Sequence, residues 1–209
     1  MHSLSRDLTA PEQRPVTTLR GVGDALAGRL ARLGVFTVQD LLFLLPLRYE
    51  DRTRVVPIGT LAVGERAVVE AEVQLTEVVF RGRRQLLSRI ADGSGFLTLR
   101  FFHFNQRQQE SLARGTRLRC FGEVRRGPLG LEIVHPEYRL VAANSTPPDE
   151  GLTPIYPTTL GVQQGRMRAL TTQALAELRD GALRDWVAPD VLATLKLPGL
   201  VSALRYVHR

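Results

Sequence analysis

The chain has 209 residues, of which 44% are hydrophobic and 23% charged, and its 28 basic and 21 acidic side chains give a formal net charge of +7. This is the composition of a globular protein with a proper core, in one domain or two small ones. No apolar run reaches the ~18 residues that a membrane span needs. The single cysteine, Cys120, excludes an internal disulfide framework and a multi-cysteine zinc site, and it fits a reducing cytoplasm.

Residues 1–55 predict a helical N-terminal subdomain. Leu26, Leu30 and Leu33 recur at the spacing of one helix face, and a glycine directly after them supplies a stop signal. A second helix is predicted over 38–45, because a proline follows it.

The turn ahead of the first helix reads LRGVG and fits the helix-hairpin-helix pattern. In that pattern the backbone N–H groups of Gly21 and Gly23 would approach a DNA phosphate at a helix N-terminus. The same turn can also be a plain structural corner, so both interpretations stay open.

Residues 56–145 change to the two-residue period of β-strands. Five strands are predicted, with a short helix between the third and the fourth: 66–76, 85–91, 96–104, helix 105–113, 116–124 and 129–141, the last of them interrupted at Pro136. Three strands, a helix and two strands is the order of the OB-fold, a five-stranded Greek-key barrel. The predicted fold class is therefore α+β, with another small barrel or a sandwich as the alternative.

Residues 146–209 begin with a proline-rich strap and continue with helical patterns over 164–178, 189–195 and 201–207. No phosphate-binding G-x-x-x-x-G-K-[ST] loop occurs, and neither H-x-x-x-H nor C-x-x-C is present. We therefore expect no catalytic residue, no metal site and no bound cofactor in this chain.

The basic residues indicate nucleic-acid binding more clearly than any residue indicates catalysis. Residues 56–145 carry 13 basic and 9 acidic side chains, and Lys196 is the only lysine of the whole chain. Arginine binds phosphate bidentately, and phenylalanine offers a stacking surface for bases. The candidate strand and backbone contacts on the outer strand faces and at the hairpin tip are Arg81, Arg83, Arg84, Arg100, Arg117, Arg119, Phe121, Arg125 and Arg126.

The motifs Y-E-D-R-T, H-P-E-Y and P-I-Y-P-T-T occur in this order, together with LRFFHFNQRQQESLARGTRLRCFGEVRRG and the LRGVG turn. With them the chain resembles the N-terminal wedge region of the RecG family of bacterial ATP-dependent DNA helicases over most of residues 19–175. The resemblance implies an OB-fold wedge domain that binds branched DNA, namely replication forks and Holliday junctions, and splits the strands. It implies motor domains, expected to follow in sequence, that use ATP and magnesium.

The family's wedge residue follows the third strand, which corresponds to Phe104, with Phe102 and Asn105 beside it. Some members carry a second aromatic four residues later, where this chain has Gln108. The resemblance also implies a cytoplasmic, nucleoid-associated monomer with a single-stranded-DNA-binding protein as a further partner. Two other functions fit the residues: a general OB module for single-stranded DNA or RNA, and a protein-interaction scaffold in which the phenylalanines are core.

Overall fold

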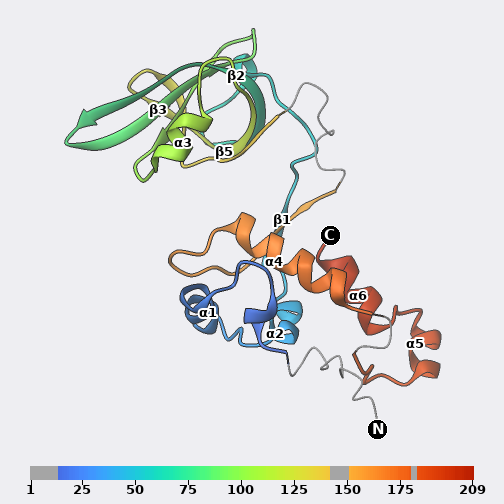
Figure 1. Ribbon diagram of the computed structural model, residues 1–209. Helices are drawn as coiled ribbons and strands as arrows, with labels where there is room; N and C mark the ends of the chain where they lie inside the picture. Colours follow the sequence, from blue (N-terminus) through green and yellow to red (C-terminus); the bar gives the residue numbers. More distant parts are fainter. Residues whose placement is uncertain (1–13, 142–150, 180–182) are drawn as a thin grey trace. The chain divides into compact units, whose positions relative to one another are not determined.

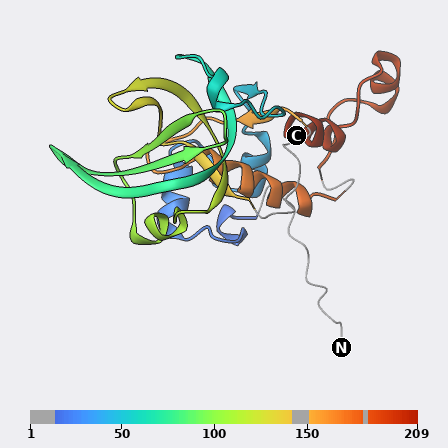
Figure 2. The ribbon, with the colours of Figure 1, turned by 90° about the horizontal axis from the view of Figure 1, so that it is seen from above.

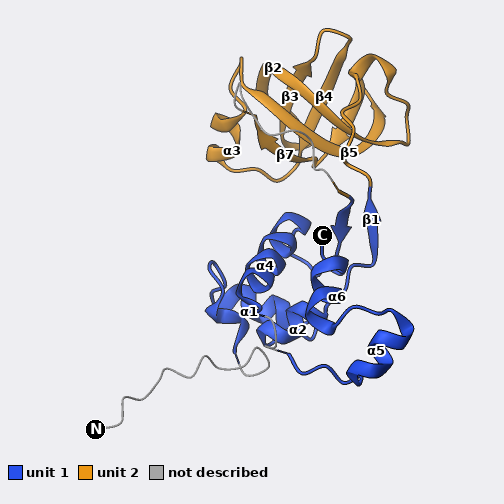
Figure 3. Cartoon of the chain, turned by 90° about the vertical axis from the view of Figure 1, so that its right-hand side faces the viewer, with its two compact units in different colours: residues 1–50, 152–209 blue, residues 51–151 orange. Residues whose placement is uncertain are grey.

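The computed structural model describes residues 14–141, 151–179 and 183–209. The chain divides into two compact units (Figure 3): unit 1 is Met1–Glu50 with Leu152–Arg209, and unit 2 is Asp51–Gly151. The sequence had suggested three consecutive parts, 1–55, 56–145 and 146–209. The first and the last of these instead fold into one unit.

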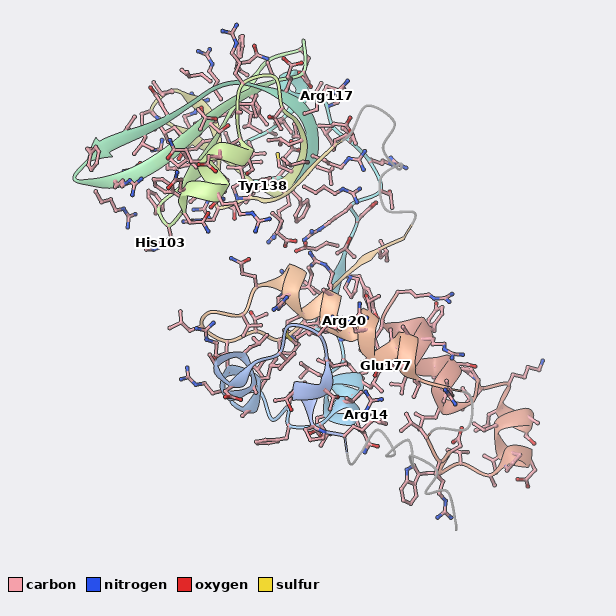
Figure 4. The ribbon with its side chains drawn as sticks, in the orientation of Figure 1. Arg14, Arg20, His103, Arg117, Tyr138 and Glu177 are labelled. Carbon is pink, nitrogen blue, oxygen red and sulfur yellow. The ribbon has the colours of Figure 1, made fainter. Side chains whose placement is uncertain are left out.

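Unit 1 is built from helices that match the predicted ones closely. They are α1 (Asp24–Ala31), α2 (Val38–Phe43), α4 (Gln164–Glu177), α5 (Pro189–Leu195) and α6 (Leu200–Val207). Helix α2 packs against α4 (Figure 1), and the two ends of the chain share one core in which Leu30 and Leu41 meet Met167 and Leu170. This shared core is why the N-terminal and C-terminal segments form a single unit. Arg14 and Glu177 form an ion pair beside it (Figure 4).

A short antiparallel pair also joins the two segments of unit 1. Strand β1 (Arg48–Glu50) pairs with β8 (Thr153–Ile155), with Tyr49 opposite Pro154. The sequence had suggested an extended strap here and no strand. A two-stranded ladder has only edge strands, which tolerate a proline.

His208 ties the end of α6 into unit 1. Its Nε2 lies 2.7 Å from the Leu42 carbonyl oxygen, so this nitrogen is the donor, and its Nδ1 accepts from the Tyr156 hydroxyl at 2.9 Å. Burial lowers the pKa of His208, although the hydrogen bond to Leu42 works in the other direction. The side chain is therefore a neutral internal link at neutral pH.

Unit 2 is the predicted β-barrel (Figures 1 and 2). Its elements are β2 (Arg66–Arg81), β3 (Arg83–Ala91), β4 (Phe96–Phe101), α3 (Gln106–Ser111), β5 (Arg117–Gly127), β6 (Gly130–Val134) and β7 (Glu137–Leu140). The strand order is β2-β3-β4-β6-β5-β7, and an additional β2–β5 pairing closes the first five strands into a ring. All pairs are antiparallel except β4–β6. This is the strand order of an OB-fold and confirms the predicted fold class.

Two details differ from the sequence prediction: β4 ends at Phe101, whereas its strand was predicted to reach Phe104, and the hairpin that precedes β4 is longer. Strands β2 and β3 run further than expected and meet at Gly82, whose φ of +72° suits the tight turn. Their hairpin projects beyond the rest of unit 2 (Figures 1 and 2). The interruption predicted at Pro136 is confirmed: the last strand divides at His135 and Pro136 into β6, which pairs with β4 and β5, and β7, which pairs with β5 alone.

The barrel core is largely apolar, and the buried Ser88 hydroxyl in it is hydrogen-bonded to that of Thr76 at 2.9 Å. It contains Leu86, Leu99 and Ile133, and also Cys120, whose pKa burial raises to about 12. A Cβ on Gly122 would lie 2.3 Å from Cγ2 of Ile133, so the close approach of β5 and β6 requires glycine. Within the described ranges, no helix is both long and apolar enough to cross a membrane.

Candidate nucleic-acid interface

The loop between β4 and α3 holds the three predicted wedge residues. Strand β4 ends at Phe101, and Phe102 and Phe104 follow it. Asn105 is the N-cap of α3, and its Oδ1 accepts a hydrogen bond of 2.8 Å from the Gln108 backbone N–H. Such a cap satisfies a helix N–H that would otherwise lack a partner. Asn105 therefore fixes the point at which the loop enters α3.

The two loop phenylalanines each lie under an arginine from the hairpin tip. The Arg83 guanidinium is 3.8 Å from the Phe102 ring centroid, and the Arg84 guanidinium is 4.6 Å from that of Phe104. These are cation–π distances. Both arginines are exposed, Phe102 is half-buried, and half-buried Phe104 also packs against the barrel core. The hairpin thus brings positive charge to both wedge rings.

Two histidines complete this site. The Phe102 backbone N–H donates to His135 Nε2 at 3.2 Å, and the His103 and His135 rings stack with centroids 6.0 Å apart. Burial, followed by the charges of His103 and Arg83, lowers the pKa of His135. Neutral His135 can therefore accept the hydrogen bond from Phe102 and hold the loop in place. We call Arg83, Arg84, Phe102, His103, Phe104 and His135 the wedge cluster; Figure 4 labels His103.

Sequence reasoning missed His135, because the histidines are scattered along the chain. Its φ of +49° is in the left-handed region, which is uncommon for a residue other than glycine. In the sequence the only sign of this corner is the proline that follows it within the predicted strand. The contact with Phe102 arises because β6 pairs in parallel with β4.

Arg100 corrects the expectation of an exposed basic face on β4. Its residue exposure is only 6%, and its Nη2 lies 2.6 Å from Glu132 Oε2, while its Nη1 lies 2.6 Å from Gln85 Oε1. The side chain points away from the barrel core, but Glu132 on β6 and Gln85 on β3 cover it. In this structure Arg100 joins strands and is not available to a phosphate.

The arginines of β5 differ among themselves. Arg119 is buried beneath Glu70, with Nη2 2.7 Å from Oε2, whereas the Arg117 side chain is 58% exposed and its Nη2 lies 3.6 Å from Glu70 Oε1. Arg117 stays a candidate phosphate contact (Figure 4), and the expected free position of Arg119 is wrong. Glu70 on β2 neutralises Arg119 because the two residues are opposite one another in the β2–β5 ladder.

Phe121 does not offer a free stacking surface either. It is 6% exposed, and the Arg52 guanidinium covers its ring at 3.7 Å. Arg125 and Arg126, towards the end of β5, are both exposed, and Arg125 pairs with Glu123 at 3.2 Å. The side chain of Arg81 lies outside the described part of the structure. Of the predicted contacts whose side chains the structure describes, only Arg83 and Arg84 lie around the wedge residues.

The helix-hairpin-helix turn lies in unit 1. Gly21 has a φ of +81°, and Gly23 is the N-cap of α1. The Gly21 carbonyl accepts a hydrogen bond of 2.7 Å from Arg166, and Asp24 follows as the first residue of α1. The carboxylate already complements the positive end of this helix. A phosphate contact of Gly21 and Gly23 stays a prediction.

Across the described residues, no group of three histidine, cysteine or acidic side chains could hold a metal ion. The wedge cluster instead combines positive charge with aromatic rings, which suits an interface for a nucleic acid. Its arginines can meet phosphates, and its phenylalanines can stack on bases of any identity.

Known proteins match this chain over nearly all of its length. The family model for the RecG wedge domain matches residues 15–178. ATP-dependent DNA helicase RecG of Escherichia coli is 48% identical over 196 residues, which cover 93% of this chain and 28% of that protein. RecG of Pasteurella multocida is 44% identical over 197 residues, again 93% of this chain and 28% of that protein.

The chain therefore spans a little over a quarter of the length of the curated relatives it matches. A solved structure of RecG bound to a three-way DNA junction superimposes with a TM-score of 0.73 at 25% identity, covering 93% of this chain and 27% of that one. Sequence and architecture agree, and the chain belongs to the RecG wedge domain family.

Proposed function

We propose that this chain is the branched-DNA-binding wedge region of a RecG-type ATP-dependent DNA helicase. Its substrates would be replication forks and Holliday junctions, and its processes fork reversal, branch migration, recombination and repair. Membership of the wedge family and the likeness to RecG in complex with a three-way junction support this function. The observation that carries it is the wedge cluster, in which two phenylalanines after β4 lie under two exposed arginines.

The proposed mechanism rests on the unstacked base-pair face that a branch point exposes. Inside a continuous duplex both faces of each base pair are stacked, whereas at a branch point the last pair has a free face. Phe104 would stack on that face, and Arg83 and Arg84, which lie over the wedge rings in this structure, would move from the rings to the neighbouring phosphates. Because stacking is indifferent to base identity, the specificity is for the shape of the DNA.

The relatives' names support ATP hydrolysis by the whole protein. This chain contains no phosphate-binding loop motif, and we expect the residues that hold ATP and magnesium to lie in the motor domains. We infer that it binds forks without ATP and has no ATPase activity of its own. Cooperation with a single-stranded-DNA-binding protein, a monomeric state and a nucleoid-associated cytoplasmic location stay predictions.

The decisive experiment compares Phe104→Ala with the parent chain on a fork, a linear duplex and a single strand. Loss of one stacking contact should cost ~1–3 kcal/mol on the fork, and far less on the linear duplex. Phe96→Ala is the matched control, because Phe96 is 57% exposed and also lies under an arginine, Arg89, at 4.2 Å. It sits at the other end of β4 from the wedge loop.

Because Phe104 also packs against the barrel core, its removal will lower stability to some extent. Phe104→Leu keeps most of this packing but cannot stack, so it should lose fork preference at little cost in melting temperature. Equal losses on fork and duplex with a large drop in melting temperature would refute the wedge role. Equal losses on fork and single strand would indicate a general single-strand module. A parent chain that shows no salt-dependent binding to any of the three DNAs would indicate a protein scaffold.

A further inference from the structure

An exposed aromatic side chain outside the wedge cluster lies near it on the β2–β3 hairpin. Phe80 is 77% exposed and is the penultimate residue of β2, next to the turn of the β2–β3 hairpin. It contributes nothing to the barrel core. Sequence reasoning gave it no role, because the predicted strand ended before it.

The register of the hairpin relates Phe80 to the wedge. Phe80 is paired with Arg84, and two residues further into the barrel Val78 is paired with Leu86. Residues directly opposite in a ladder share a face, and the same face recurs every second residue. Leu86 belongs to the core, so Phe80 and Arg84 continue the core-facing side of the hairpin beyond the barrel.

Arg84 is therefore the cross-strand neighbour of Phe80 and also the ring partner of Phe104, at 4.6 Å. Cross-strand neighbours have Cβ atoms roughly 5 Å apart. A single arginine side chain thus separates the exposed ring from the proposed wedge ring.

The surroundings of Phe80 favour a nucleic-acid strand over other partners. Residues 78–87 contain three arginines and no acidic residue. Arg83 and Arg84 are exposed on the same hairpin. An exposed aromatic ring among arginines matches bases linked by phosphates, since the ring stacks and the guanidinium groups neutralise charge.

We infer that Phe80 is a second base-stacking residue, which holds an unpaired DNA strand as it leaves the branch point. The inference rests on the proposed function and deepens it. A duplex arm presents no free base face along its length, so the ring acts on a single-stranded arm.

The test uses Phe80→Ala on two substrates: a three-way junction whose arms are all duplex, and a fork with one single-stranded arm. One lost stacking contact predicts roughly 5- to 150-fold weaker binding to the fork, with the all-duplex junction little affected. Phe96→Ala is again the control and should change neither affinity. Because Phe80 is exposed, the melting temperature should be unchanged.

A direct readout of stacking is available, because Trp186 is the only tryptophan. In a Trp186→Phe background, the tryptophan fluorescence of the Phe80→Trp variant should be quenched by the fork with the single-stranded arm and not by the all-duplex junction. Equal effects of Phe80→Ala on both substrates, or none on either, would overturn the inference. Failure of the proposed function would instead appear in the parent chain, as a lack of preference for either branched substrate over linear duplex.

Discussion

Arg100 offers a sharp test of the division between structural and DNA-binding arginines. Its side chain is 8% exposed and that of its partner Glu132 is 12% exposed. Two of its nitrogens bind Glu132 Oε2, at 3.0 and 2.6 Å, and a third binds Gln85. Arg100→Ala would leave the Glu132 carboxylate buried without its cation.

Removing one partner of a buried ion pair costs ~3–5 kcal/mol. In a domain of about 100 residues, each kcal/mol shifts the melting temperature by ~4–8 °C. Arg100→Ala should therefore lower the melting temperature of unit 2 by at least about 10 °C. Replacing both partners by apolar residues of similar volume, as in Arg100→Met with Glu132→Leu, should recover most of this loss.

Two measurements separate the possible roles of Arg100. Hydrogen exchange of the amides of β4 and β6 reports the stability of the barrel by itself, and fork titrations over a salt series report the phosphates neutralised. The double variant should melt close to the parent and keep the same slope of log K against log salt. A double variant that is stable but whose slope is flatter by ~0.7–0.9 would show that Arg100 contacts a phosphate.

Two further predictions concern charge. Arg117→Ala should flatten the slope of log K against log salt by ~0.7–0.9, whereas Arg119→Ala should destabilise the barrel and leave that slope unchanged. Both slopes are measured by fork titrations over a salt series, and an Arg117→Ala variant that kept the parent slope would contradict the prediction. Burial and nearby positive charge lower the pKa of His135 from 6.5, so the unfolded chain takes up its proton first as the pH falls. The contribution of neutral His135 to the stability of the barrel is present above pH 6.5 and is lost as the pH falls through the pKa that His135 has in the folded state. Protonation of His135 also removes the acceptor of the hydrogen bond from the Phe102 backbone N–H. Fork affinity and barrel melting temperature should then fall together below pH 6.5, and His135→Asn should flatten both profiles; an identical pH profile in that variant would contradict the role of His135.

Local patterns in the sequence were sufficient for most of the elements. The alternation from Ala67 to Leu75 predicted a strand because successive side chains of a strand point to opposite faces. The leucines at 26, 30 and 33 predicted α1 for the corresponding helical reason. The order of these elements then indicated the OB-fold, and the closing β2–β5 pairing confirms it.

The same alternation led to the wrong expectation that Arg100 and Arg119 are exposed to solvent. It correctly placed Arg100 and Arg119 on the side away from the barrel core, but it carries no information about what lies against that side. Their partners, Glu132 and Glu70, come from strands 32 and 49 residues away in the chain. The pairing of strands decides which charges meet, so burial of these arginines was not predictable from local sequence.

The wedge cluster depends on tertiary structure even more. Phe102 and Phe104, at the end of the predicted third strand, were identified by resemblance to the family. Arg84 reaches Phe104 because of the hairpin register, and His135 reaches Phe102 because β6 lies parallel to β4. Local periodicity determines which way each side chain points, whereas only the non-local pairing of strands determines which side chains meet.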